Sequence, residues 1–167
     1  AFFDKKNIGI AIVFMLIYRL SEAMLVKLAS PFMLDARSEG GLGLSTEAVG
    51  VVYGTVGIIA LIVGGILGGI AISRWGLRRC LMPMALALTL PNLVYVYMAL
   101  WQPTSLVLIN GAVAAEQFGY GFGFTAYMMY LIRFSEGEYK TSHYAICSGF
   151  MALGMMLPGM AAGWIQT

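Results

Sequence analysis

The sequence predicts an all-α fold, a polytopic transmembrane helix bundle of about five spans, from its composition and its long apolar stretches. Of the 167 residues, 60% are hydrophobic and only 11% are charged, whereas soluble domains carry about 25% charged residues. A small soluble domain keeps a large surface and cannot bury so much apolar area. The excess is therefore expected to face lipid, and the same composition excludes a disordered chain.

A membrane-spanning helix needs about 20 apolar residues, since about 30 Å of hydrocarbon is crossed at about 1.5 Å per residue. Stretches of that length predict a single bundle over residues 1–167, with helices at residues 8–29, 46–72, 80–101, 105–134 and 141–165. Strands of a membrane barrel would alternate apolar and polar residues. Residues 58–63 are continuously apolar instead, which favours helices.

Polar and turn-forming residues set the boundaries of these helices. Pro31 and the polar run 35–41 are expected to end the first helix. Ser45 is a suitable N-cap for the second helix, and Glu47 follows where the helix dipole favours an acid. Polar turns separate the last three helices, at residues 102–104 and 135–140. Kinks are expected at the prolines inside or beside the apolar runs, Pro83, Pro91 and Pro158.

Small residues recur every four positions in two of the predicted helices. The second helix has two such runs, Gly50 and Gly54, then Ala60, Gly64 and Gly68, and the fourth helix has one, Gly111, Ala115, Gly119 and Gly123. This spacing forms a ridge along which another helix can approach closely. Residues 119–123 also resemble a glycine-rich nucleotide loop, but they follow no strand, so a packing role is favoured.

Basic residues indicate the orientation of the bundle, because cytoplasmic loops carry an excess of Lys and Arg. With the N-terminus of this segment in the cytoplasm, that side holds Lys5, Lys6, Arg74, Arg78, Arg79, Arg133 and Lys140. Only Arg37 faces the other side. The chain starts at Ala1, and an odd number of spans is unusual for half of a transporter. We therefore expect a piece of a longer protein that lacks at least one further helix.

Ionisable residues at membrane depth are the strongest functional signal, since each costs about 2.5–3.5 kcal/mol at a helix centre. Arg19 lies about 16 Å along the first helix from Ile8, and Glu22 is close enough to pair with it at i+3. Glu116 and Gln117 lie at a similar depth in the fourth helix. Such groups either form structural ion pairs that lock helices together or line a pathway for substrate or protons.

Other polar and aromatic residues give weaker signals. Tyr18 adds a hydroxyl beside Arg19, whereas Lys27 lies nearer the surface and could reach the interface with its long side chain. Several tyrosines could line a cavity, namely Tyr95, Tyr97, Tyr127 and Tyr130. Two tryptophans fit an interfacial aromatic belt, Trp101 and Trp164.

Nothing in the sequence indicates an enzyme. His143 is the single histidine, and no Ser-His-Asp set or metal-ligand spacing accompanies it. One histidine without a partner makes neither a metal site nor a general base. We therefore expect no catalytic activity, no cofactor and no metal.

Residues 69–79 resemble the cytoplasmic signature loop of the major facilitator superfamily. The matching positions of this gating loop are Gly69, Arg74, Gly76, Arg78 and Arg79. Ser73 stands where the family has an acid, and Leu77 adds one residue before the basic pair. These departures are similar to the degenerate copy found in the second half of such transporters.

Four other segments resemble the C-terminal half of AmpG-type permeases, a branch that also includes acetyl-CoA transporters. They are residues 18–22, 45–50, 116–123 and 158–164. The resemblance covers almost the whole chain, as helices seven to eleven of the family. It implies a proton-coupled importer of muropeptides, working by alternating access in the bacterial inner membrane.

In this resemblance, Arg19, Glu22 and Glu116 match charged family positions. We expect Glu116 or Glu22 to take the proton and Arg19 to hold an anionic group of the solute. The implied partners are the lipid bilayer, a small solute, protons and a missing N-terminal half of the same transporter, with no nucleic acid. Two alternatives stay open: a non-transporting structural or assembly subunit, and a transporter of the same fold with another substrate.

Overall fold

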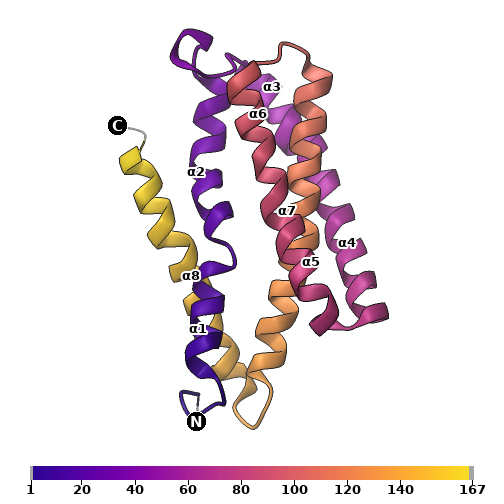
Figure 1. The fold of residues 1–167 in the computed structure, drawn as a ribbon, viewed down its shortest axis with the longest axis vertical. Helices are drawn as coiled ribbons and strands as arrows, with labels where there is room; N and C mark the ends of the chain where they lie inside the picture. The colour runs from indigo at the N-terminus through magenta and orange to yellow at the C-terminus, as the bar shows by residue number, and fades with distance from the viewer. Residues whose placement is uncertain (1, 166–167) are drawn as a thin grey trace.

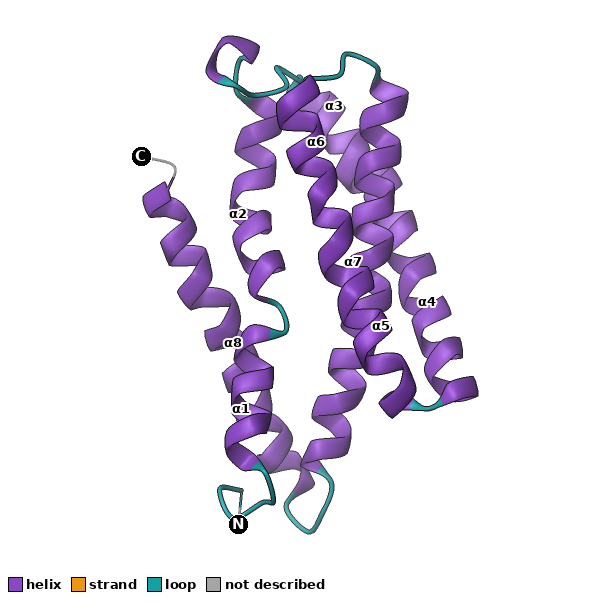
Figure 2. Ribbon diagram, viewed as in Figure 1, coloured by secondary structure: helices purple, strands orange, loops and turns teal. Residues whose placement is uncertain are grey.

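The computed structural model describes residues 2–165, and side chains as far as Ala161. This part of the chain contains helices and loops but no strand (Figure 2). The predicted all-α bundle is therefore confirmed. Trp164, expected in the interfacial belt, lies outside the residues whose side chains are described.

Within residues 2–165, five long helical segments cross the bundle, and three of them are interrupted. The first consists of α1 (Ile8–Ile17) and α2 (Leu20–Leu34); the second of α3 (Thr46–Val51), the π-helical turn η2 (Val52–Gly57) and α4 (Ile58–Trp75); the third of α5 (Leu77–Thr89), the 3-10 turn η3 (Leu90–Asn92) and α6 (Leu93–Trp101); the fourth is α7 (Leu106–Ser135), and the fifth is α8 (Lys140–Ile165). A short 3-10 turn, η1 (Arg37–Glu39), lies in the loop before α3.

The segments run alternately up and down (Figure 1). The chain start, the α4–α5 junction and the α7–α8 loop lie at one end, which we call the basic end. The α2–α3 and α6–α7 loops lie at the other. At the basic end, Lys5 Nζ donates to the carbonyl oxygens of Phe134, at 2.6 Å, and Glu136, at 2.8 Å. At the opposite end, Arg37 donates to the carbonyl oxygens of Gln102 and Pro103.

Four of the five segments are long and apolar enough to cross a membrane within the described residues. They are Ile8–Leu34, Thr46–Trp75, Leu77–Trp101 and Lys140–Ala161. The remaining predicted span, α7, is about 45 Å long at about 1.5 Å per residue, but it is less apolar because it carries Glu116, Gln117 and many glycines and tyrosines. α7 makes the most extensive contacts with α4 and α5, so neighbouring helices, rather than lipid, cover much of its surface.

Three of the predicted boundaries are wrong. Pro31 lies inside α2, which continues to Leu34, because a proline in a membrane helix removes only one backbone hydrogen bond that neighbours can replace. The second helix extends to Trp75 and the third begins at Leu77. Gly76, at φ +80°, is the single residue between them, since glycine adopts this conformation without strain.

The predicted N-cap and part of the predicted glycine packing are confirmed. The Ser45 side chain accepts a hydrogen bond from the Ala48 amide at 3.2 Å. A Cβ at Gly64 would overlap the Phe118 carbonyl oxygen of α7, and a Cβ at Gly119 would overlap the Ala87 carbonyl oxygen of α5. The ridges are shorter than predicted, because three of their glycines have open space where a Cβ would stand: Gly50, Gly54 and Gly111.

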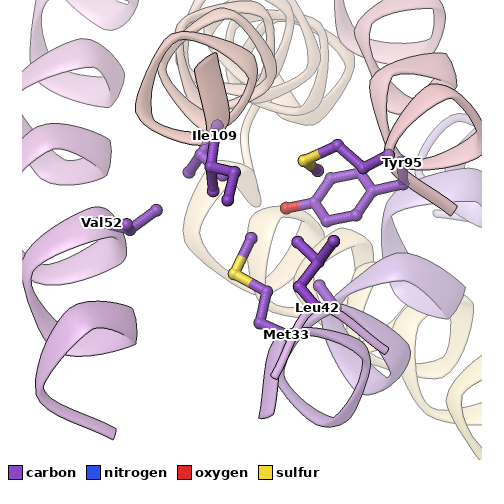
Figure 3. Close-up of a cluster of buried hydrophobic side chains, with 8 residues drawn as sticks. Met33, Leu42, Val52, Tyr95 and Ile109 are labelled. Carbon is purple, nitrogen blue, oxygen red and sulfur yellow. The ribbon is translucent and has the colours of Figure 1, made fainter. Parts of the chain in front are cut away.

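The described residues form three apolar clusters. One packs α4, α5 and α7 together around Met84, and the other two lie one toward each end of the bundle. The cluster far from the basic end includes Met33, Leu42 and Ile109 (Figure 3). The cluster nearer the basic end includes Met15 and Tyr127. Both are built partly from the first segment, and the polar residues of that segment lie between them. The core is therefore divided by a polar layer at the level of the break between α1 and α2.

Candidate functional site

A cavity of about 640 Å³ opens between α2, α3, η2 and α7. Its polar lining consists mainly of Arg19, Glu22, Tyr53, Glu116, Gln117 and Tyr120. The volume falls within the range of about 300–1,000 Å³ that is typical of small-molecule sites. Of the residues predicted for the pathway, Arg19, Glu22, Glu116 and Gln117 therefore share one space.

The three ionisable side chains of this cavity are almost fully buried. Arg19 is 7% exposed, Glu22 1% and Glu116 2%. Groups of this kind inside a membrane are costly and usually paired or functional. Their partners therefore decide what the cavity can do.

Arg19 lies in the interruption between α1 and α2, where the helix is not continuous. Its backbone has φ −106° and ψ 16°, and it directs its guanidinium group to α7. The Arg19 NH2 group donates to the Tyr120 hydroxyl at 2.6 Å, and the guanidinium carbon lies 4.6 Å from the centre of the Phe124 ring. Arg19 is thus held by an aromatic surface through hydrogen bonding and cation–π attraction.

Two tyrosine hydroxyls hold the interruption itself. Tyr127 of α7 donates to the carbonyl oxygen of Met15 at 2.8 Å, and Tyr18 donates to the carbonyl oxygen of Gly123 at 3.0 Å. In lipid, a backbone carbonyl freed by a helix break needs a partner of this kind. The break is therefore stabilised by contacts with α7 rather than by a local glycine or proline.

Glu22 does not pair with Arg19, so the predicted i, i+3 interaction is wrong. The described residues form no ion pair between these two groups, and Glu22 Oε2 has no hydrogen-bond partner. The prediction assumed a continuous helix, in which residues three apart face each other. Because Arg19 precedes α2, its side chain turns toward Tyr120 instead.

Glu116 is held by neutral groups. The Gln117 amide donates to both of its carboxylate oxygens, at 3.2 Å and 3.0 Å. Tyr95 and Glu22 are both close enough to the Glu116 carboxylate to interact with it electrostatically. The cavity thus combines two carboxyl groups with one guanidinium group, which interacts electrostatically with Glu22 but forms no ion pair with either carboxyl group within the described residues.

Tyr18 and Lys27, also predicted for the pathway, do not line this cavity. Tyr18 stacks on Tyr127 with ring centres 5.1 Å apart. Lys27 is exposed on the surface between α2 and α8, where it borders a shallow pocket beside Gly159. Neither residue is therefore placed to meet a solute in the cavity described above.

The predicted gating motif lies far from the cavity, at the basic end. Its residues are exposed around the α4–α5 junction: Gly69, Arg74, Gly76, Arg78 and Arg79. Arg74 lies in the last turn of α4, and Arg78 and Arg79 lie in the first turn of α5, so the motif is a helix–glycine–helix corner rather than a loop. Ser73, in place of the family acid, donates to the carbonyl oxygen of Ile70 at 2.8 Å within its own helix.

Sequence reasoning missed the aromatic residues that shape the cavity. The four tyrosines suggested as lining residues do not line it, whereas Tyr53 and Tyr120 do. Tyr120 directly follows Gly119 of the packing ridge. Because it lies one residue further along α7, its side chain has a different direction from that ridge and points toward Arg19. No local signal marks the π-helical turn that carries Tyr53.

No group of three or more His, Cys, Asp or Glu side chains that could hold a metal ion occurs within the described part of the chain. Apolar helices, interrupted around a buried polar cavity, define a multi-pass membrane protein with the architecture of a solute transporter.

The chain is similar over nearly its full length to anhydromuropeptide permeases and AmpG proteins. It is 28% identical over 163 residues to the anhydromuropeptide permease of Escherichia coli strain K12, covering 98% of this chain and 32% of the relative. It is 28% identical over 152 residues to AmpG 4 of Rickettsia conorii, covering 90% of this chain and 35% of that protein. No protein-family model matches the chain.

The predicted resemblance to AmpG-type permeases is therefore confirmed. These relatives carry the names of permeases and transporters rather than of enzymes. The chain spans about a third of the length of the curated relatives it matches.

Proposed function

We propose that this chain forms part of the solute pathway of a secondary transporter that imports a muropeptide-like solute together with protons. The observation that carries the proposal is the cavity in which Arg19, Glu22 and Glu116 are buried without pairing to one another. The similarity to a protein named anhydromuropeptide permease supports the class of solute.

Arg19 is the group suited to an anionic part of the solute. Its Nε atom is buried and has no hydrogen-bond partner, so the guanidinium group keeps a free donor. A carboxylate of the solute would accept from that donor and gain a charge-assisted hydrogen bond. The aromatic surface of Tyr120 and Phe124 holds the guanidinium group in place for this contact.

Glu22 and Glu116 are the candidate proton carriers. Both are buried without a cation bonded to them, and Glu22 Oε2 has no hydrogen-bond partner. Uptake of a proton by either acid removes a charge from the membrane interior, where charges are costly. Protonation therefore changes the free-energy difference between the state in which the cavity is open to water and the state in which it is closed.

Alternating access supplies the transport cycle in this proposal. Interrupted helices at mid-membrane are typical of transporter sites, around which two bundles rock. This chain would contribute most of the C-terminal bundle of a major facilitator fold in a bacterial inner membrane. The concentration of Lys and Arg at the basic end supports a cytoplasmic position for that end.

A structural or assembly subunit would need these ions only to hold helices together. The absence of an Arg19–Glu22 ion pair in the described residues argues against that alternative. A transporter of the same fold with another solute would use the same cavity, and only uptake measurements separate it from a muropeptide carrier.

The test is proton-driven uptake of a radiolabelled anhydromuropeptide by the full-length permease that contains this segment. Glu116→Gln and Arg19→Ala are expected to lose most of the uptake, whereas Glu47→Gln, an exposed acid outside the cavity, is expected to keep it. Unchanged uptake in both cavity variants would contradict the assigned roles. Segment 1–167 reconstituted alone is expected to move no solute.

A further inference from the structure

A groove of about 360 Å³ lies between α4 and α5, next to the junction that places these helices at the basic end (Figure 1). One wall includes Ala71 and Trp75 of α4, and the other includes Arg79 and Pro83 of α5. Phe122 of α7 completes the lining. The groove shares no lining residue with the polar cavity, so the proposed solute pathway leaves it without a role.

The groove and the polar cavity lie on opposite sides of α7. Phe122 lines the groove, whereas Tyr120 lines the cavity, and two residues two positions apart in a helix point about 200° apart. Met82, beside the groove on α5, is 71% exposed. We therefore expect the groove to open toward the lipid that surrounds the bundle.

The walls of the groove are held together at its base. The Cys80 thiol of α5 donates to the carbonyl oxygen of Ala71 in α4, with 3.5 Å between sulfur and oxygen. Ala71 is 5% exposed, Cys80 6% and Met84 1%. Buried residues of this kind are close-packed and fixed in position, so the groove exists before any ligand enters it.

Positive charge gathers at the mouth of the groove. Arg79 lines it, and Arg74 and Arg78 lie exposed beside it. No acidic residue occurs in the sequence between Glu47 and Glu116. Within the described part of the chain, none of the three arginine side chains has a hydrogen bond or an ion pair. Their donors are therefore available to an anion from outside the bundle.

We propose that this groove binds an anionic phospholipid of the bilayer. Arg79 holds the phosphate, because the planar guanidinium group matches phosphate oxygens with two parallel donors. Part of one acyl chain lies along the groove against Pro83 and Phe122. Trp75, which is 59% exposed, then stands at the level of the lipid headgroups, where tryptophan is enriched.

The combination of an apolar groove with unpaired arginines selects a lipid over other occupants. Basic pockets between membrane helices are typical binding places for anionic headgroups. A free phosphate ion would use the arginines but not the apolar walls. A second copy of the chain in a symmetric contact would bring the same arginines to the same place, where their like charges repel.

The test is native mass spectrometry of the full-length protein that contains this segment, titrated with dioleoyl phosphatidylglycerol or with the zwitterionic dioleoyl phosphatidylcholine. The wild type is expected to bind the first phosphatidylglycerol more tightly than phosphatidylcholine. Arg79→Gln should weaken that binding about fivefold and leave phosphatidylcholine unchanged. Arg78→Gln is the matched control, because it removes the same charge from a neighbouring residue that does not line the groove, and it should weaken binding far less.

A second readout reports where the lipid binds. The fluorescence that Trp75→Phe removes is the contribution of Trp75, and brominated phosphatidylglycerol should quench it more strongly than brominated phosphatidylcholine. Arg79→Gln should abolish this difference, whereas Arg78→Gln should keep it. Both variants replace exposed side chains, so a loss of folding is not expected to obscure either measurement.

Four outcomes would overturn the lipid site. They are equal weakening by Arg78→Gln and Arg79→Gln, which indicates general attraction to a charged surface; equal quenching of Trp75 by the two brominated lipids; binding of glycerol phosphate as tight as that of phosphatidylglycerol; and a dimer that Arg79→Gln dissociates. None of these measurements involves uptake, so their failure leaves the proposed function untouched, and a failure of proton-driven uptake leaves the lipid site untouched.

Discussion

Replacing Gly64 by alanine should destabilise the contact between α4 and α7, the most extensive contact in the bundle. A Cβ at this position would overlap the carbonyl oxygen of Phe118 and stand 3.0 Å from the amide nitrogen of Phe122. Both atoms belong to the backbone of α7, so no rotation of a side chain can relieve the overlap. The two helices must move apart.

The expected cost follows from the rigidity of these atoms. Overpacking of a core costs about 1–3 kcal/mol, and the upper part of that range applies where backbone must move. Gly69→Ala on the same helix is the matched control, because nothing lies within 4 Å of the added methyl group. It should be neutral or stabilise α4 by up to about 1 kcal/mol through helix propensity. The two variants should therefore differ by about 2–4 kcal/mol.

The assay is reversible unfolding of the purified protein in mixed micelles, followed by circular dichroism while the denaturing detergent is increased. Gly64→Ala should unfold at a lower detergent fraction than the wild type, and Gly69→Ala at the same or a higher fraction. Equal stability of the two alanine variants would refute the packing of α4 on α7 described above.

Three smaller changes give further tests. Tyr127→Phe removes the donor to the Met15 carbonyl at the helix break and should cost about 0.6–1.7 kcal/mol in the same unfolding assay. Phe124→Leu removes an aromatic face from Arg19 and should weaken binding of an anionic solute several-fold by calorimetry. Ser45→Ala removes the cap of α3 and should cost about 1 kcal/mol in unfolding. No effect in any one of these measurements would contradict the corresponding contact.

The helical segments could be predicted from the sequence because lipid imposes a length and a composition on anything that crosses it. The depth of Arg19 and Glu116 followed from counting residues along those helices. The structure places both residues in one cavity. This agrees with the count, because two buried ions at the same depth in a small bundle must lie close to each other. The predicted helix ends were less accurate. The helical hydrogen bonds of α2 continue past Pro31, and Gly76 alone separates α4 from α5.

The kink expected at Pro91 coincides with the 3-10 turn η3, whereas the break at Arg19 could not be predicted, because its cause lies in another helix. No glycine or proline marks the break at Arg19, and the Tyr127 hydroxyl that satisfies the Met15 carbonyl is 112 residues away in sequence. The glycine spacing of α7 predicts one ridge of small residues at four-residue intervals. Gly121, two residues from Gly119, in fact packs its opposite face against Leu61 of α4, because two helical residues are about 200° apart.

Cysteine labelling of the full-length protein in intact membranes tests most directly whether water reaches a cavity inside this bundle. Gly50 lines the cavity with open space for a side chain, and Val96 is 54% exposed on α6. Each lies five residues from the end of its segment, counted from Ser45 and Trp101, so both are about 7.5 Å deep.

With Cys80 and Cys147 replaced by alanine, Gly50→Cys should react with a membrane-impermeant maleimide. Val96→Cys should react only after denaturation, because lipid covers it. Equal labelling of both cysteines without denaturation, or protection of Gly50→Cys, would contradict a water-accessible polar cavity enclosed by lipid-facing helices.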